Sequence, residues 1–179
     1  MLKIFSTQVS GLLKSISDKE EQQIEESSRL LAQTILSDGT VYFKGFGEME
    51  AVVSEALHGE NPFKKAERFR DDSLDELLPV DSVVIASRFQ TDEGAFAFCE
   101  RIKEAADCHV ILIGGHKKEE ENSDIKADIM IDTKAVRGLV PLDDGSRVGF
   151  PSGLAGLFVY YALFLTTEEI LEEYVLDKE

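Results

Sequence analysis

Two glycines separated by one phenylalanine form the segment of this sequence best suited to hold an anion. Gly45 and Gly47 join a β-branched and aromatic run at Thr40–Phe43 to a helical pattern that starts at Met49. A strand that turns on glycines into a helix directs backbone N–H groups and the positive end of the helix dipole to one point, which is a common way to bind phosphate. The candidate binding residues of this turn are Gly45, Phe46, Gly47 and Glu48.

Two further loops carry polar side chains at predicted strand ends. The apolar runs Ser82–Ala86 and Val110–Ile113 predict buried strands, and they lead into the loops Ser87–Thr91 and Gly114–Lys118. In a parallel sheet the carboxyl ends of the strands share one edge, and ligands of α/β folds bind there. The candidate binding residues of these two loops are Ser87, Arg88, Gln90, Thr91 and His116.

Carboxylates near both helix starts oppose a bound anion. Glu48 and Glu50 follow the glycine turn, and Asp92 and Glu93 follow the serine-containing loop. Acidic residues at a helix N-terminus stabilise the helix by roughly 0.3–1 kcal/mol, which is sufficient reason for their presence. They would also repel a phosphate by about 1 kcal/mol per charge at ~4 Å in water. An inward-pointing Arg88 would offset this repulsion, and Lys44 would act in the same way.

The elements that must position these residues alternate along the chain. Helical patterns at Phe5–Ile16 and Ile24–Leu36 come first, and strands such as Ile129–Ile131 are then separated by helices. This order predicts an α/β fold, a three-layer sandwich with a mostly parallel five-stranded sheet and two N-terminal helices. We expect a single domain made of an N-terminal helical pair (1–38), an αβ core (39–132), and a hairpin with C-terminal helices (133–179).

Local signals predict where several elements begin and end. Ser17–Glu21 reads as a capping box that opens the second helix, and Gly39 is a suitable residue to close it. A short strand is predicted at Glu67–Arg70. Asp144-Gly145 favours a type I′ turn in a hairpin over 139–150. Thr166 with Glu169 predicts that a separate acidic helix restarts near the C-terminus.

Composition excludes several classes of protein. The net charge of −16 argues against nucleic-acid binding, which requires clustered lysine and arginine. The longest apolar window, Leu154–Leu165, is shorter than the ~20 residues of a membrane span, and the N-terminus has no signal-peptide pattern. Cys99 and Cys108 have neither metal-site nor disulfide-framework spacing. We expect a cytoplasmic protein with two reduced thiols and with neither metal nor cofactor.

The order of elements and two motifs resemble the sugar isomerase (SIS) domain. SIS proteins combine a Gly-x-Gly-x-Ser turn with a Ser-x-Ser-Gly-x-Thr loop that holds a sugar phosphate, and the corresponding segments here are Gly45–Met49 and Ser87–Thr91. Ala127-Asp128 before Ile129–Ile131 is a third similarity. The resemblance covers about Gln23 to Leu165 and is to a bacterial branch named, by similarity, phosphoheptose isomerases. It implies a flavodoxin-like or Rossmann-like sheet, a sugar phosphate ligand and a homodimer.

The motifs depart from the family pattern at residues that carry chemistry. Met49 stands where the family has a serine hydroxyl, and Phe89 with Gln90 replaces a Ser-Gly pair. Ser87 and Thr91 keep hydroxyl groups that can donate to phosphate. Thr91 is equally well placed to be the N-cap of the following helix.

The resemblance also implies where catalytic residues would lie. Phosphoheptose isomerases place a glutamate base near the end of the helix after the glycine turn, just before Leu-x-Gly. Matching on Leu57-His58-Gly59 puts Ala56 at that position and Glu55 one residue earlier, which turns the side chain by ~100° around the helix. The candidate base is therefore Glu55, and the histidine candidates are His58 and His116; a plain surface role is the alternative for each histidine.

Three functions remain open from the sequence. The first is a sugar-phosphate isomerase with a rearranged site, using Glu55 or a residue of a second subunit as base. The second is a non-catalytic module that binds and senses a sugar phosphate or related metabolite. The third is a structural role in which the glycines serve only close helix–sheet packing. Phosphosugar binding is common to the first two and is the predicted function.

Overall fold

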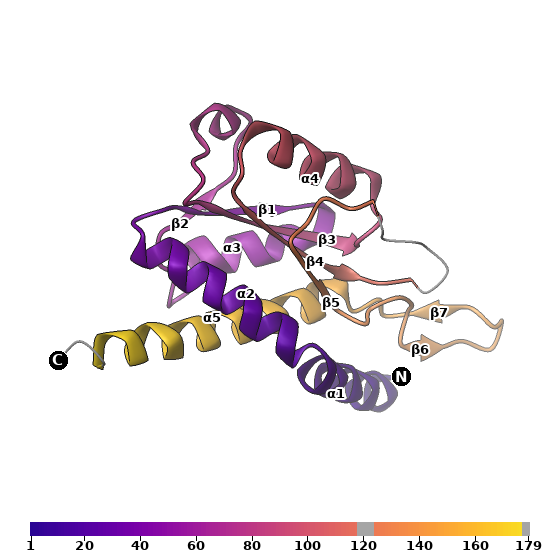
Figure 1. Cartoon of the computed structure of the whole chain (residues 1–179). Coiled ribbons are helices and arrows are strands. Elements are labelled where there is room, and N and C mark those ends of the chain that lie inside the picture. Colours follow the sequence, from indigo (N-terminus) through magenta and orange to yellow (C-terminus); the bar gives the residue numbers. More distant parts are fainter. Residues whose placement is uncertain (118–123, 177–179) are drawn as a thin grey trace.

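Five parallel strands form one sheet in the computed structural model, which describes residues 1–117 and 124–176 (Figure 1). The strands are β1 (Val41–Gly45), β2 (Ala66–Arg68), β3 (Ser82–Phe89), β4 (His109–Gly115) and β5 (Ile129–Asp132). Their spatial order is β2-β1-β3-β4-β5, and every pairing is parallel. This confirms the predicted α/β fold with a parallel five-stranded sheet.

Helices cover both faces of the sheet. The helices are α1 (Leu2–Lys19), α2 (Glu21–Leu36), α3 (Glu50–His58), α4 (Glu93–Ala105) and α5 (Ser152–Leu176), with short 3-10 helices η1 (Gly47–Met49) and η2 (Asp71–Glu76). Helices α2, α3 and α5 pack on one face, and α4 packs on the other (Figure 1). Helix α1 projects beside a small antiparallel hairpin of β6 (Val140–Pro141) and β7 (Arg147–Val148).

Strand alternation divides the apolar side chains between two cores. Phe43 and Val84 belong to the core under α2, α3 and α5, whereas Tyr42, Val83 and Ile85 belong to the core under α4. Because successive side chains of a strand point to opposite faces, a strand buried on both sides must be apolar nearly throughout. This explains why β3 reads as a continuous apolar run in the sequence.

The predicted capping box between the first two helices is wrong. The cap between α1 and α2 is Glu20, and its side chain makes no capping hydrogen bond. Glu20 is 7% exposed, and its carboxylate accepts hydrogen bonds from the Asp132 backbone N–H (3.0 Å) and from the Lys134 ammonium. A tertiary contact therefore uses the carboxylate that the local pattern assigned to the helix start.

The end of α2 also differs from the simple glycine pattern. Asp38 adopts the left-handed backbone conformation with φ of 63°. Gly39 is required for another reason, because a Cβ atom there would lie 2.4 Å from the Val80 carbonyl oxygen.

The predicted hairpin is confirmed, but its turn is of another type. A type I′ turn needs positive φ at both central residues. Only Gly145 has it, with φ of 83°, and its N–H donates to the Leu142 carbonyl at 3.0 Å. This geometry is typical of a type I turn closed by a glycine bulge.

Helix α5 is continuous, so the predicted restart at Thr166 is wrong. Thr167 and Leu171 are buried, and α5 packs along α2 through this region. Burial in the tertiary structure therefore keeps the helix continuous, despite a local sequence signal for a new helix start at Thr166. Among the described residues α5 alone is long and apolar enough to span a membrane, and 39% of its apolar window is buried inside the fold. The buried part contacts α2, α3 and the sheet.

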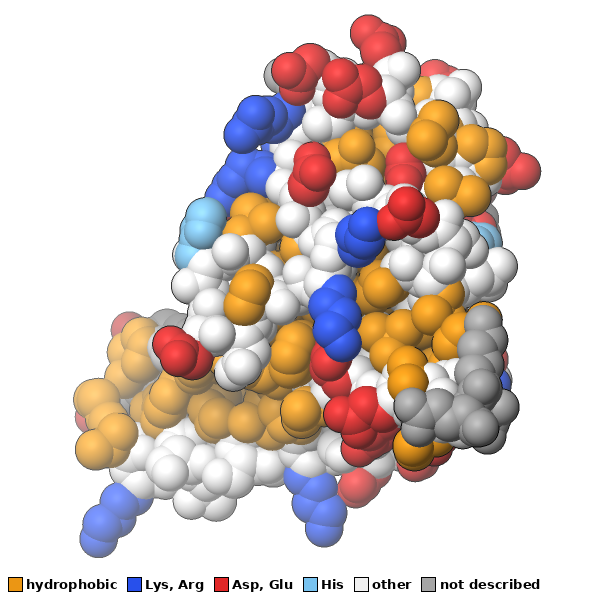
Figure 2. Space-filling view, turned by 90° about the vertical axis from the view of Figure 1, so that its left-hand side faces the viewer, with side chains coloured by type: hydrophobic (Ala, Val, Ile, Leu, Met, Phe, Trp, Pro, Cys, Tyr) orange, Lys and Arg blue, Asp and Glu red, His pale blue; other side chains and the backbone are white. Residues whose placement is uncertain are grey.

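One stripe of α5 and the start of α1 remain exposed. Leu154, Tyr161 and Leu165 are 50%, 46% and 58% exposed, and Leu2 is 80% exposed. Figure 2 shows a band of apolar side chains across the lower part of the molecule, above a rim of uncharged polar and basic side chains. Such a surface is larger than isolated apolar residues would give and is typical of an interaction site.

Candidate ligand site at the carboxyl ends of the strands

The glycine turn after β1 is dictated by how closely the chain approaches α3. A Cβ atom on Gly45 would lie 2.7 Å from the backbone nitrogen and Cα of Glu50. Gly47 has φ of 57°, a conformation that side-chain-bearing residues rarely adopt. The two glycines therefore have separate structural causes, and the family's serine position is occupied by Met49, which is fully buried against Gly156 of α5.

Glu48 and Arg88 form the most specific polar contact at this edge of the sheet. The Arg88 guanidinium donates from Nε to Glu48 Oε1 at 2.7 Å and from Nη2 to Glu48 Oε2 at 2.8 Å. The Ser152 hydroxyl donates to the same Oε1 at 2.6 Å. Hydrogen bonds from Arg88 are the largest cause that holds the pKa of Glu48 at about 2, below its ordinary value of 4.5.

The serine-containing loop satisfies its own polar groups. Strand β3 continues through Ser87 to Phe89 with an irregular register after Ala86. The Ser87 hydroxyl donates to the Phe89 carbonyl at 2.7 Å, and the Phe89 N–H donates to an Asp92 carboxylate oxygen at 3.0 Å. Asp92, rather than Thr91, is the N-cap residue of α4. The carboxylate of Asp92 thus lies where the resemblance places a phosphate-binding loop.

Aromatic rings surround these polar groups. Phe46 packs on Phe98 and lies next to Gly94 at the start of α4. The Phe89 ring meets the Phe150 ring edge-on at 5.8 Å, and the Arg88 guanidinium lies 5.8 Å from the centre of the Phe150 ring. Rings of this kind orient the guanidinium and offer apolar surface to the carbon skeleton of a ligand.

Two further cations lie over aromatic rings in the same region. The Lys44 ammonium lies over the rings of Phe46 and Phe98, at 5.6 and 5.7 Å from their centres. The Lys117 ammonium lies 3.9 Å from the centre of the Phe89 ring. The predicted loop Gly114–Lys118 ends outside the described residues. His116 is partly buried, and its backbone N–H donates to Asp132 at 2.9 Å.

The candidate catalytic residues lie farther along α3. Glu55 follows Glu48 by seven residues, which is roughly 10 Å of helix. Its carboxylate accepts a hydrogen bond from the Tyr161 hydroxyl at 2.7 Å, and this bond is the largest cause of the raised pKa of Tyr161. His58 is exposed at the end of α3. The structure therefore brings Glu48, Ser87 and Arg88 together at the carboxyl ends of the strands. Glu55 and His58 lie farther along α3, away from those ends.

Ser152, Asp92 and Phe150 were missed as site residues. Ser152 lies 104 residues from Glu48 in the chain, so no local spacing connects the two. The available signal was Pro151-Ser152 at the start of the last helix, because helix starts collect at the carboxyl ends of parallel strands. No group of three His, Cys, Asp or Glu residues suited to a metal ion occurs within the described ranges.

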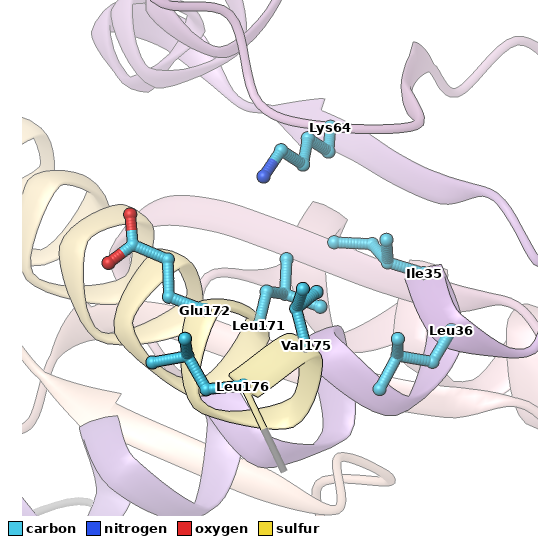
Figure 3. Close-up of a pocket in the computed structure, with 7 residues that line it drawn as sticks. All are labelled: Ile35, Leu36, Lys64, Leu171, Glu172, Val175 and Leu176. Carbon is cyan, nitrogen blue, oxygen red and sulfur yellow. The ribbon is translucent and has the colours of Figure 1, made fainter. Parts of the chain in front are cut away.

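A separate apolar groove lies between the ends of α2 and α5 (Figure 3). It has a volume of about 490 Å³ and includes Ile35, Leu36, Leu171 and Val175, with Lys64 at its margin. The Lys64 ammonium is paired with Glu168 at 2.7 Å. This groove adjoins the start of β1 through the end of α2, so it is distant from the strand ends described above.

Solved structures share this fold over most of the chain. The NanR protein of Vibrio vulnificus, determined in complex with ManNAc-6P, has a TM-score of 0.68 and 13% identity, covering 97% of this chain and 64% of NanR. The sugar isomerase domain of an RpiR transcription factor from Sphaerobacter thermophilus has a TM-score of 0.63 and 14% identity, covering 98% and 93%. The phosphoheptose isomerase GmhA of Neisseria gonorrhoeae has a TM-score of 0.62 and 13% identity, covering 91% and 94%.

These neighbours establish the SIS-like fold predicted from the two motifs. At the sequence level, the Bacillus subtilis (strain 168) protein "Uncharacterized protein YwjG" is 36% identical over 176 residues, which cover 97% of this chain and 99% of that protein. Residues 1–171 match the family described as "Domain of unknown function (DUF2529)". The chain therefore belongs to the DUF2529 family, and its fold is that of the SIS domain.

Proposed function

We propose that this protein binds a sugar phosphate at the carboxyl ends of β1, β3 and β4, with Arg88 as the cationic partner of the phosphate. The observation that carries the proposal is the two-pronged contact between the Arg88 guanidinium and the Glu48 carboxylate. The same planar donor geometry suits phosphate oxygens. The NanR structure, which contains a sugar phosphate on a related fold, supports this class of ligand.

Glu48 then acts as an internal competitor for Arg88. Both side chains are considerably exposed, at 37% for Glu48 and 52% for Arg88. An ion pair of this exposure contributes only ~0–1 kcal/mol, so an arriving phosphate can replace the carboxylate at small cost. The mechanism requires Glu48 to rotate away while Ser152 and the aromatic rings stay in place.

Binding measurements with matched variants test this proposal. Calorimetry of the full chain with sedoheptulose, fructose and glucosamine phosphates should reveal binding of at least one of them. Arg88→Gln should weaken that binding ~10-fold or more, because charge-assisted hydrogen bonds are lost. Glu48→Gln should strengthen it about fivefold, because one like charge and the competitor are removed.

Arg68→Gln is the matched control for these variants. Arg68 forms a similar half-exposed ion pair with Glu50 at 2.6 Å, but at the β2 edge of the sheet. Its loss should leave sugar phosphate binding unchanged. Absence of binding in both the wild-type protein and Glu48→Gln would refute the proposal and leave the structural role of the glycine turn.

Isomerisation by Glu55 is the second candidate function. The observation in its favour is the hydrogen bond between Tyr161 and Glu55, which places a carboxylate beside the exposed stripe of α5. In a homodimer formed through that stripe, Glu55 would meet the second copy, and we propose such a dimer. A coupled aldose–ketose assay decides between the functions: binding without turnover leaves the sensing role, and turnover abolished by Glu55→Gln supports the enzyme. A cytoplasmic location stays a prediction.

A further inference from the structure

A second cavity, apart from the apolar groove between α2 and α5, lies beside the projecting helix α1. It has a volume of about 640 Å³ and is bounded by α1, by the segment after β5, and by the hairpin. Figure 1 shows α1 and the hairpin at the same end of the molecule. They are in contact, because a Cβ atom on Gly149 would lie 3.0 Å from the Phe5 ring. A volume of this size is within the range of small-molecule sites, roughly 300–1,000 Å³.

The charge of this cavity is opposite to that of the chain. Its lining includes Lys134, Arg137 and Arg147, and no aspartate or glutamate of the described chain lines it. The whole sequence has 35 acidic and 19 basic residues. The charge of Lys134 is balanced by Glu20 and Asp132. Arg137, from the segment after β5, and Arg147, from the hairpin, converge without a lining carboxylate and give a local field that attracts anions toward an otherwise acidic protein.

These cations have hydrogen-bond donors left for a ligand. The Arg147 guanidinium donates from Nε to the Gly138 carbonyl at 2.6 Å and from Nη2 to the Leu139 carbonyl at 2.9 Å. Because a guanidinium has five N–H donors, three remain. Arg137 is exposed and has no ion pair or hydrogen bond within the described residues.

Lys134 is fixed in position by its neighbours. It has a left-handed backbone with φ of 55°, and its N–H donates to Asp132 Oδ1 at 2.7 Å. Its ammonium donates to Glu20 and, at 3.0 Å, to Asp132 Oδ2. One of its three donors is therefore left. Strained backbone of this kind persists only where surrounding contacts hold it, and it reduces the ordering cost of binding.

We propose that this cavity is a binding site for a small metabolite with at least two negative charges, borne by phosphate or carboxylate groups. Arg137 and Arg147 bind the charged groups, and Leu12, Val136 and Leu139 cover the carbon skeleton. The site is separate from Arg88. The two sites meet at Asp132, whose Oδ1 accepts from both the Lys134 and the His116 backbone N–H.

Calorimetry with inorganic phosphate and with citrate tests the proposal, at an ionic strength held constant with sodium chloride. Both the wild-type protein and Arg88→Gln should bind at least one of these anions saturably, so the result does not depend on the proposed sugar phosphate site. Stronger binding of phosphate would assign the ligand to the phosphate esters, and stronger binding of citrate would assign it to the polycarboxylates.

Arg137→Gln should weaken this binding ~10-fold, because charge-assisted hydrogen bonds are lost from an exposed residue whose removal leaves the fold intact. Arg101→Gln, which removes an exposed arginine of α4, is the control and should bind as the wild type does. The proposal is wrong if neither anion binds saturably, if Arg137→Gln binds normally, or if Arg101→Gln is weakened equally. If Arg88→Gln alone lost binding, the anion would be assigned to the strand-end site and the proposal would be wrong.

Discussion

The Arg88 guanidinium and the Glu48 carboxylate bind each other through hydrogen bonds of 2.7 and 2.8 Å, joining the end of β3 to the turn after β1. The two residues are 40 positions apart in the chain and meet because β1 and β3 are parallel neighbours whose carboxyl ends lie together. The contact also gives the acidic residue of the glycine turn a role that is compatible with anion binding, because the carboxylate can be exchanged for a ligand.

The ion pair predicts how stability depends on pH. The pKa of Glu48 is about 2 in the folded protein, below its ordinary value of 4.5. The unfolded chain therefore binds more protons between these values, and the contribution of Glu48 is present above pH ~4.5 and lost as the pH falls toward ~2. Denaturant unfolding from pH 6 to 2 should show a smaller loss of stability in Glu48→Gln than in wild type. Arg88→Gln should show the same reduction, and a wild-type pH slope in both variants would contradict the prediction.

The two glycines of the turn should respond differently to substitution. Gly45→Ala forces backbone atoms of β1 and α3 apart and should reduce the free energy of unfolding by ~1–3 kcal/mol. Gly47→Ala meets no atom within 4 Å but must adopt positive φ, which costs ~1–2 kcal/mol. Urea denaturation measures the free energy of unfolding of both variants. Calorimetry of the folded variants compares their sugar phosphate affinities. If Gly45→Ala were as stable as the wild type, the prediction would be wrong, and the backbone of Gly45 and Glu50 would be able to move apart without cost.

Tyr160→Phe should stabilise the protein. Tyr160 is 1% exposed among the rings of Phe43, Phe63 and Phe164, and its hydroxyl has no partner within the described residues. Removing an unpaired buried hydroxyl should raise the free energy of unfolding by ~1 kcal/mol or more. Tyr161→Phe is the control, since it loses only an exposed hydrogen bond and should change stability by less than ~0.5 kcal/mol. A destabilised Tyr160→Phe would indicate a buried water bound to the hydroxyl.

Both cysteines should be unreactive in the native protein. Burial raises the pKa of Cys99 to about 12 and that of Cys108 to about 11, so little thiolate is present at neutral pH. A disulfide exchange reagent should therefore modify neither thiol within minutes at pH 8, and it should modify both in guanidinium chloride. Rapid reaction of one native thiol would contradict the burial of that cysteine.

The exposed stripe of α5 predicts the effect of a surface charge on assembly. If Leu154, Tyr161 and Leu165 meet a second copy, Leu165→Lys should shift the protein from dimer to monomer in light scattering. Leu78→Lys is the control, because Leu78 is similarly exposed at 56% but lies outside this stripe. A wild-type protein that is monomeric at high micromolar concentration would exclude the proposed dimer.

Much of the fold was predictable because strong patterns repeat along the chain. The strands β1, β3, β4 and β5 were predicted to within a few residues, since a strand covered on both faces is apolar at nearly every position. The short edge strand β2 starts one residue before the predicted Glu67. Local capping signals were less informative. The Glu20 carboxylate accepts a hydrogen bond from the Asp132 backbone N–H of β5 instead of capping a helix, and α5 continues through Thr166 without a break.

The sequence by itself determined the α/β order, the apolar strands and the loops that meet at the carboxyl ends of the sheet, because these features depend on periodicity and on glycine placement. Only the tertiary structure decided which charges meet there. Glu48 pairs with Arg88 and Ser152, Glu20 pairs with Lys134, and Asp92 binds the loop that precedes it. Such pairings depend on side chains brought together from positions as many as 114 residues apart. No local spacing in the sequence encodes such contacts. The pairing of Glu48 with Arg88 and Ser152 at the strand-end site is therefore visible only in the folded chain.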